Sequence, residues 1–471
     1  MSNKLVLRSG YGFFYGGQES GPFSNPSPGF NPPYMSSEAF NAPCDAAVAN
    51  TTVGGSADCS ISNANNSGLP LNIMSAGFPT ASLSNPNSPE FYSLDPHLVT
   101  PYTQQWHLGL EYQLPADTVL EVSYGGSRGL KLFAFYNGNQ PTPSPNASDP
   151  TAPRRPAHEP TPGSGGTCSV NAYYNDPSTY NCNEALDTEI ATLRSNAQSN
   201  YDSLQVRLEK RYSHGLQYQV SYTYAHALDT ASSASLGSVN NGDFLDQRYP
   251  NANYGNSDFD VRHRFVFSYV YDLPFGRGRA LGKNASGVVN QILGDWQMSG
   301  VFSAATGNYY TATDVNSVAN TNNEGGGTVV VGSSSRPAII GNPNAKPCVP
   351  GTLFNTCAFV DDNTPGYSNS IPAGTFGDAP RNDIEGPGYT EWDASFVKQF
   401  PISEQKHFEF RAEFFNILNH VNYLFEPTGD ISEAPTPLIL GATGANGQPV
   451  FGLPMAARAP RQIQFALKFY F

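Results

Sequence analysis

The sequence is short of charged residues, since aspartate, glutamate, lysine and arginine together make up only 14% of its 471 positions. Soluble domains usually carry about 25% charged residues, so the composition disfavours an ordinary soluble domain. Long apolar runs are also lacking, because no stretch approaches the roughly 18 apolar residues that a membrane-spanning helix needs. If the chain crosses a membrane, it must therefore cross it with β-strands.

Basic residues are few: 25 Lys and Arg stand against 39 Asp and Glu, which gives a net charge of −14. Proteins that bind nucleic acid usually present a basic face, so we expect no nucleic-acid partner. The chain begins Met1-Ser-Asn-Lys-Leu-Val-Leu-Arg8, without the apolar core of a signal peptide. The features described below predict export, and we therefore expect the chain to lack its natural N-terminus.

The six cysteines fall into three local pairs: Cys44 with Cys59, Cys168 with Cys182, and Cys348 with Cys357. Each pair lies in a polar stretch rich in glycine, proline and asparagine. This arrangement predicts three disulfides that close parts of long loops in an oxidising compartment, in preference to free thiols. A zinc site would need closer cysteine or histidine spacing, so no metal is expected.

The last eleven residues alternate between apolar and polar side chains. One face of the predicted strand carries Ile463, Phe465, Leu467, Phe469 and Phe471, and the other carries Gln462, Gln464, Ala466, Lys468 and Tyr470. Alternation of this kind, ending in an aromatic carboxy-terminus, is typical of the closing strand of an outer-membrane β-barrel. The last strand of a soluble sandwich alternates equally well, so this segment alone leaves both folds open.

The same period of two predicts about ten strands along the whole chain. They cover residues 4–15, 103–113, 118–127, a hairpin over 200–228, then 262–272, 296–306, 391–400, 406–416 and the last eleven residues. Aromatic residues gather near the strand ends on the apolar face, as they do in the girdles of membrane barrels. The pattern predicts an antiparallel, all-β chain.

The connections between these strands alternate in length. Short periplasmic turns are predicted at 114–117, 213–215, 273–295 and 401–405, and long extracellular loops at 16–102, 128–199, 229–258, 307–388 and 417–460. Outer-membrane barrels have short turns on one side and long loops on the other, whereas a sandwich has no reason to segregate loop lengths. The turn 273–295 is exceptional in its length. All six cysteines fall in the predicted extracellular loops.

The face opposite the apolar one carries charges of both signs. We expect the following residues to face the lumen of the barrel: Arg207, Glu209, Arg211, Arg264, Glu409, Arg411 and Glu413. Arginine and glutamate on adjacent strands are expected to pair there. Glu409 and Glu413 lie four residues apart on one strand face near Arg411, which indicates a ladder of lumen charges instead of a glycosidase carboxylate pair.

The remaining candidate sites favour structural interpretations. The segment Gly276–Lys283 lacks the spacing of a phosphate-binding loop and is predicted to be a turn. Asp258 and Asp260 precede a strand, and calcium is an alternative there, but the EF-hand spacing is absent. No HExxH motif is present. We therefore expect no enzyme activity, no catalytic or metal-ligating residues and no cofactor.

Several motifs, in the same order, resemble those of the Oar-like TonB-dependent receptors of Gram-negative bacteria. They are Asn200–Arg211 (NYDSLQVRLEKR), Asp258–Phe265 (DFDVRHRF), Tyr271–Gly276 (YDLPFG), Phe410–His420 (FRAEFFNILNH) and Pro460–Phe471. The resemblance implies an outer-membrane barrel of 22 strands, filled by an N-terminal plug and driven by TonB. Such receptors import scarce large ligands, such as metal chelates or glycans, or bind surface partners. Residues 1–471 resemble the C-terminal part of that barrel, without plug domain, TonB box or signal peptide.

We therefore predict a partial transmembrane β-barrel of about ten strands, in the outer membrane of a Gram-negative bacterium. Its expected function is that of a receptor or transporter, with an unknown extracellular ligand bound by loops 16–102, 128–199 and 307–388. The expected partners are membrane lipid, a plug domain and through it TonB, and the outer-membrane assembly machinery. The predicted assembly signal consists of Phe465, Leu467, Phe469 and Phe471. A passive barrel or surface adhesin is the alternative, and a soluble secreted β-protein is a third hypothesis.

Overall fold

The computed structural model describes most of the strands that the alternation predicts and a large part of the loops. The described residues are 4–16, 91–138, 190–232, 246, 249–285, 287–314, 323–324, 328–329, 336–361, 364–367, 370–372, 375–403, 406–425, 438–444 and 447–471. The predicted cysteine pairs 44–59 and 168–182 lie outside these residues, as do most of the loops 16–102 and 128–199.

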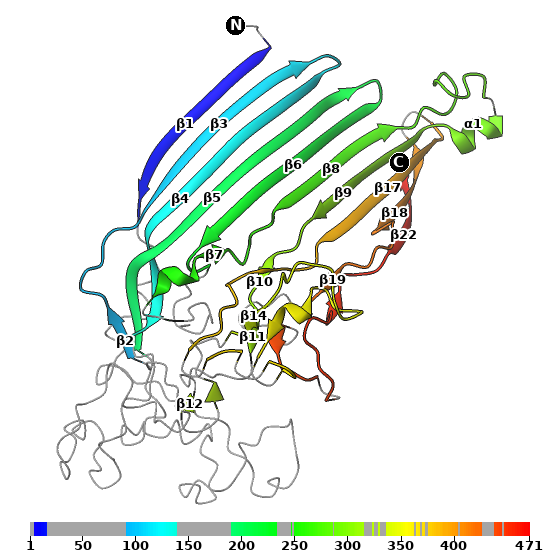
Figure 1. Cartoon of the computed structure of the whole chain (residues 1–471). Helices are drawn as coiled ribbons and strands as arrows, with labels where there is room; N and C mark the ends of the chain where they lie inside the picture. The colour runs from blue at the N-terminus through cyan, green and yellow to red at the C-terminus, as the bar shows by residue number, and fades with distance from the viewer. Residues whose placement is uncertain are drawn as a thin grey trace, which may run out of the picture.

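Ten strands follow one another across a single sheet, and each pairs antiparallel with the next (Figure 1). They are β1 (Leu5–Tyr15), β3 (Tyr102–Leu114), β4 (Thr118–Asn137), β5 (Ile190–Ser213), β6 (Leu216–Asp229), β8 (His263–Asp272), β9 (Trp296–Ala305), β17 (Tyr389–Pro401), β18 (His407–Phe415) and β22 (Gln462–Tyr470). The predicted strands and their order are confirmed. Two short strands complete the sheet of twelve: β2 (Phe91–Leu94) pairs parallel with β5, and β7 (Gly255–Asn256) pairs antiparallel with β6.

Short turns and long connections lie at opposite ends of this sheet (Figure 1). Turns join β3 to β4, β5 to β6 and β17 to β18, and the connection from β8 to β9 at the same end carries the helix α1 (Gly287–Leu293). Both ends of the chain also lie at this end (Figure 1). The predicted segregation of loop lengths is therefore present. Among the described residues no helix is both long and apolar enough to cross a membrane.

The two faces of the sheet differ as the alternation predicts. On β22 the apolar residues Phe465 and Leu467 are 69% and 67% exposed, and two-residue alternation puts them on the same face of the strand. The register places these residues beside the phenylalanines of β18, with Phe410 opposite Leu467 and with Phe410 and Phe465 stacked at 6.2 Å between ring centroids. In a membrane barrel an exposed apolar face of this kind meets lipid. The assembly role of the terminal aromatic residues stays a prediction.

The strands β4 and β5 extend well beyond the predicted bounds, to Asn137 and back to Ile190. Period-two alternation stops at Gly125 and Gly126, which is why the sequence pattern ends the first of them early. Backbone pairing needs no alternation and continues past irregular register between Gly129 and Ala134. The extension packs around a buried group of its own, in which Tyr136 is fully buried.

The outermost strands β1 and β22 are the two edges of the sheet. Within the described part of the chain, β1 pairs only with β3 and β22 pairs only with β18. Each edge therefore presents a row of backbone N–H and C=O groups that these ten strands do not pair. The sheet is open between them.

A folded layer of loops lies at the long-loop end, below the strands in Figure 1. Its short strand pairs are β10 (Tyr309–Tyr310) with β16 (Ile384–Glu385), β11 (Thr313–Asp314) with β20 (Ile439–Leu440), β12 (Asn323–Glu324) with β13 (Thr328–Val329), β14 (Ala338–Ile339) with β15 (Phe359–Val360), and β19 (Tyr423–Leu424) with β21 (Ala456–Ala457). The 3₁₀ turns Pro250–Asn253 and Thr356–Ala358 lie in the loops as well. Because β11 of the loop 307–388 pairs with β20 of the loop 417–460, these two loops fold together.

Aromatic residues form the core of this loop layer. Phe354 is 2% exposed and makes edge-to-face contacts with Phe359, Phe425 and Phe451 at centroid distances of 5.2–6.1 Å. Such pairs contribute about 0.5–1.5 kcal/mol each beyond the burial of their area. The loop layer therefore has a hydrophobic core of its own and a defined fold.

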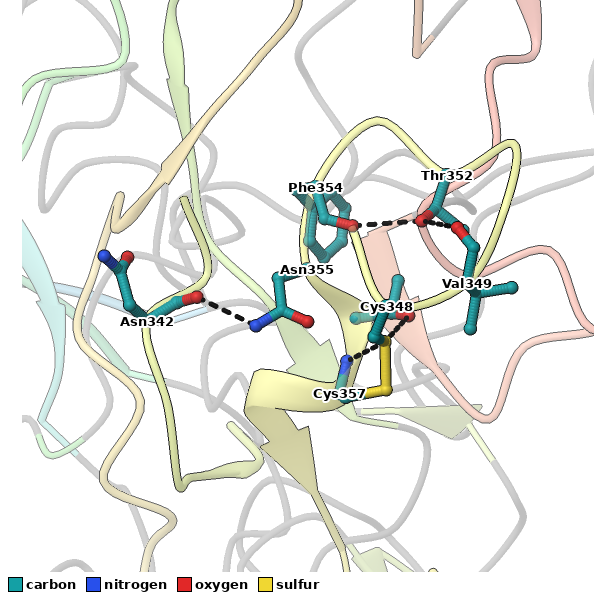
Figure 2. The surroundings of a disulfide bond; sticks show 8 residues. Asn342, Cys348, Val349, Thr352, Phe354, Asn355 and Cys357 are labelled. Carbon is teal, nitrogen blue, oxygen red and sulfur yellow. Dashed lines mark hydrogen bonds between the residues drawn. A yellow bond between two sulfur atoms is a disulfide. The ribbon is translucent and has the colours of Figure 1, made fainter. Parts of the chain in front are cut away.

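The predicted disulfide between Cys348 and Cys357 is present beside this core (Figure 2). It closes a loop in which Thr352 donates hydrogen bonds to the carbonyl oxygens of Val349 and Phe354, at 2.8 and 3.1 Å. The backbone N–H of Cys357 points at the sulfur of Cys348, 3.2 Å away. The disulfide and these bonds fix the segment that carries Phe354.

Replacing Phe354 by alanine tests the aromatic core. Because the cavity left by a buried phenylalanine costs about 3–5 kcal/mol, Phe354→Ala is expected to accelerate amide exchange at residues 358–360. The control Val349→Ala removes a side chain from the same disulfide loop that is 46% exposed, and should leave the exchange nearly unchanged. If residues 358–360 are protected from amide exchange equally in both variants and in the wild-type protein, the loop layer does not depend on this core.

Candidate functional site

The charged residues predicted for the lumen occupy the polar face of the sheet. On β5 the guanidinium of Arg207 lies 2.5 Å from Glu209. On β18 Arg411 bridges two carboxylates, at 3.0 Å to Glu409 and 3.4 Å to Glu413. Glu409, Arg411 and Glu413 therefore form a ladder of paired charges on β18, and its position in a lumen stays a prediction.

These charges pair differently from the prediction. Arginine and glutamate were expected to pair between adjacent strands, but the pairs above join residues two apart on the same strand. The register explains the difference on β18, since Arg411 stands opposite Val397 on one side and Ala466 on the other. Pairing between neighbouring strands occurs at the other edge, where Arg8 of β1 lies 3.3 Å from Glu111 of β3.

Two further arginines of the predicted set lie apart from these pairs. Arg211 is exposed near the short-turn end, where its backbone N–H donates to the carbonyl of Asp117 at 3.0 Å. Arg264 is exposed near the long-loop end of β8, opposite Ala305. The structure therefore does not gather all seven predicted lumen charges into one cluster.

The polar face carries an open hollow of about 430 Å³ between β5 and β18. Its polar lining includes Glu209, Gln217, Gln219, Ser268, Ser299, Asp393, Ser395 and Glu413. Glu209 of β5 and Glu413 of β18 line the same hollow although four strands lie between β5 and β18. The curvature of the sheet brings these two side chains to it. Three carboxylates line the hollow, and two of them, Glu209 and Glu413, are neutralised by Arg207 and Arg411.

A buried polar network joins the long-loop end of the sheet to the loop layer, and we call it the rim network. At its centre Arg381 is 1% exposed at the side chain. Its guanidinium donates to Asp229 at 2.6 Å, to the hydroxyl of Ser232 at 2.6 Å and to Asp258 at 3.2 Å. Asp229 ends β6, whereas Arg381 belongs to the loop 307–388, so the ion pair connects segments 152 residues apart.

Asn382 extends the rim network by pairing with the segment before β8. Its side-chain amide donates to the carbonyl of Asn256 at 2.7 Å and to Asp258 at 2.6 Å. Asn256 returns a bond of 2.9 Å to the carbonyl of Asn382. The backbone approach is close, since a Cβ added at Gly255 would lie 2.8 Å from the carbonyl oxygen of Arg381. Glycine is therefore required at this contact.

The two aspartates considered for calcium take part in this network. Asp260 is 1% exposed, accepts the N–H of Ala227 at 2.8 Å and pairs with Arg262 at 3.0 Å. Asp258 accepts from Arg381 and Asn382, so both carboxylates have cationic or amide donors as partners. Among the described residues no group of three or more His, Cys, Asp or Glu side chains is arranged to hold a metal ion.

Sequence reasoning missed Arg381, Asn382 and Asp229. The motif around Asp258 was noted, but its cationic partner Arg381 lies more than 120 residues later, in a loop rich in proline, glycine and asparagine. A single arginine in an irregular loop has no periodic signal. The single hint was Asp258-Phe-Asp260-Val-Arg262 itself, since acidic residues beside a strand end need a cation once they are buried.

Local environment shifts the pKa of two carboxyl groups in the loops. Partial burial raises the pKa of Asp383, which follows the rim network in sequence. The pKa of Asp95 is lowered, first because its carboxylate accepts the backbone N–H of His97 at 2.8 Å. Loss of the Asp383 charge is therefore easier than for a carboxyl group in water, whereas Asp95 holds its charge to lower pH.

Comparison with known proteins identifies the family to which this fold corresponds. A family model described as "Outer membrane beta barrel domain" matches residues 1–464. No curated protein matches the chain.

Solved structures of much longer chains resemble it. The outer membrane transporter YddB from Escherichia coli is 10% identical, with a TM-score of 0.37, over 82% of this chain and 34% of that one. BauA, the ferric preacinetobactin receptor from Acinetobacter baumannii, is 12% identical, with a TM-score of 0.33, over 79% and 30%. The FrpB iron transporter from Neisseria meningitidis is 10% identical, with a TM-score of 0.31, over 80% and 32%. The chain thus spans about a third of the length of these structures.

Removal of the central arginine tests the rim network. Because Arg381→Met leaves Asp229 and Asp258 without their cation, we expect it to cost about 3–5 kcal/mol of local stability. Adding Asp229→Asn should restore part of this loss, with a coupling of about 0.5–3 kcal/mol. Amide exchange and limited proteolysis of residues 378–385 in detergent-solubilised protein measure the effect.

The control for this cycle is Arg458→Met. Arg458 is an exposed arginine that lies over the ring of Tyr389 at 4.5 Å, away from Asp229. A contact of this kind is worth only about 0.5–1 kcal/mol. Strictly additive effects of Arg381→Met and Asp229→Asn would contradict the ion pair as the bond that holds the loop.

Proposed function

The chain belongs to the outer membrane beta barrel domain family, and from this premise we propose that it forms the barrel wall of a receptor or transporter. It lies in the outer membrane of a Gram-negative bacterium. In the proposed function, the loops at the long-loop end bind an extracellular ligand, and the polar face of the sheet lines its route. The proposal is one of binding and passage and includes no catalysis.

The rim network is the observation that carries this proposal. Arg381 and Asn382 fasten the loop 307–388 to the ends of β6 and β7, at the long-loop end of the sheet. Burying an arginine against two aspartates is costly unless its geometry is well defined, so the network favours a loop with a fixed shape. A fixed loop layer at one end of the sheet suits selective binding better than loose connections would.

We also propose that residues 1–471 supply the C-terminal part of a larger barrel. The open edges β1 and β22 support this, because the barrel wall must be closed for every backbone group in lipid to find a partner. In this arrangement further strands pair with these edges, and a plug domain contacts Arg207, Arg411 and their glutamates. TonB then acts through the plug, and the outer-membrane assembly machinery inserts the barrel.

The orientation of the loops is tested by inserting an epitope after Lys346, which is exposed in the loop 307–388. Antibody is expected to bind this epitope on intact cells because the loop is extracellular. The matched insertion after Ser403, in a short turn, should bind only after the cells are permeabilised. Binding with the opposite preference would reverse the topology and remove the loops from ligand contact.

Uptake is tested in the native host after in-frame deletion of the gene. We expect the deletion to lose uptake of at least one of two probes, radioactive iron as its citrate complex or a fluorescent maltooligosaccharide. Plasmid-borne wild-type protein should restore it, and a protonophore should abolish it because transport through TonB needs energy. Uptake that persists with the protonophore would favour a passive barrel, and unchanged uptake of both probes would reject transport of these two ligand classes.

A further inference from the structure

The connection from β8 to β9 is unlike the other connections at its end of the sheet. Residues 273–295 form a folded turn in which Leu281 donates to the carbonyl of Pro274 and Gly276 donates to the carbonyl of Leu281, at 2.8 and 2.9 Å. The helix α1 (Gly287–Leu293) follows within the same turn (Figure 1). None of the described residues of this segment lines the polar hollow, and the segment lies at the opposite end of the sheet from the loop layer (Figure 1).

Four apolar side chains form a stripe along α1. Val288, Val289, Ile292 and Leu293 are 72%, 54%, 60% and 54% exposed. Their spacing of one and four residues places them within an arc of about 140° of the helix. On the other side of α1, Asn290 accepts the backbone N–H of Arg277 at 2.6 Å and so holds the helix to the turn. The stripe is therefore turned away from the protein.

The turn is fastened to the outward, apolar face of the sheet. The indole N–H of Trp296 donates to the carbonyl of Ile292 at 2.8 Å. The ammonium of Lys398, which is 2% exposed, donates to the carbonyl of Gly294 and lies 5.6 Å from the Trp296 ring. Trp296 and Lys398 are register partners, and Lys398 is the partner of Phe410 on the next strand. The stripe therefore continues the face that meets lipid.

Basic residues accompany the stripe. Arg277, Arg279 and Lys283 are exposed in the turn, and Asp295 is the only acidic residue between positions 273 and 295. This local excess of positive charge contrasts with the net charge of −14 for the whole chain. Phe275 and Leu281 add 42% and 52% exposed apolar side chains to the same turn.

We propose that this turn is a membrane anchor that lies in the lipid interface at the short-turn end of the barrel. The stripe of α1 inserts among the acyl chains, and Arg277, Arg279 and Lys283 bind the anionic phosphates of phospholipid headgroups. Amphipathic helices with basic residues beside an apolar face bind membrane interfaces in this way. Trp296 lies at the same level, where indole rings are enriched in membrane barrels.

We infer that lipid covers the apolar stripe of α1, because the stripe continues the outward face of β9 and β17. A protein partner that covered the stripe would have to displace lipid from Trp296 and from the strands beside it. The anchor fixes the height of β8 and β9 in the membrane, at the strands that line the centre of the polar hollow.

Spin labels placed on the two sides of α1 test the anchor. The variants Ile292→Cys and Gln291→Cys are labelled without reductant and reconstituted in vesicles of phosphatidylethanolamine and phosphatidylglycerol. Labelled parent protein supplies the background from the six native cysteines. Collision rates are measured with oxygen, which concentrates in lipid, and with a water-soluble nickel chelate. The ratio of oxygen to nickel collisions is expected to be severalfold higher at position 292 than at position 291.

Two outcomes would overturn the proposal. Equal nickel access at both positions would place the stripe in water. Protection of position 292 from oxygen and nickel alike would show that protein covers the stripe. Both substitutions are at exposed positions of a short surface helix, so neither is expected to prevent folding, and detergent-solubilised samples with wild-type circular dichroism confirm this for each variant.

Discussion

Every backbone N–H and C=O group in the hydrocarbon layer must find a partner inside the protein, and this constraint governs the whole architecture. Ten strands satisfy it for one another by antiparallel pairing from β1 to β22. Two-residue alternation then follows, because one face of each strand meets lipid and the other meets a wet interior. The same constraint makes the outer edges of β1 and β22 the two places where the wall is incomplete. The proposed larger barrel is the most direct way to pair them.

At the long-loop end, buried polar contacts hold the loop layer to the sheet. Arg381 is almost wholly buried, and its charge is matched by Asp229 and Asp258 together with the hydroxyl of Ser232. An unpaired charge at this depth would cost several kcal/mol, so the loop has few alternative positions that keep the arginine satisfied. The aromatic core around Phe354 stabilises the layer from within, and the rim network fixes where that layer sits. These two elements together define the surface that an extracellular ligand would meet.

The sequence predicts the ten strands of the sheet far better than it predicts the rim network, because only the strands have a repeating pattern. Alternation such as Leu204, Val206 and Leu208 repeats at fixed spacing, and lipid on one side enforces it along every strand. The extensions of β4 and β5 escape this pattern because they pass beyond the lipid and pack on Tyr136. The pairing of Arg411 within its own strand depends on the register, which places uncharged residues on both neighbouring strands. Arg381 carries no periodic signal, and its partners are distant in sequence, so only the folded chain reveals it.

The two ends of the sheet are fixed by opposite chemistry. At the long-loop end, buried ion pairs tie the loop layer to β6 and β7. At the short-turn end, Lys398 and Trp296 tie α1 to the outward face, and the apolar stripe is left for lipid. A barrel wall that is held at both ends resists tilting in the membrane. The exceptional length of the turn 273–295 is consistent with this role, because a two-residue hairpin has no room for an amphipathic helix that reaches the lipid interface.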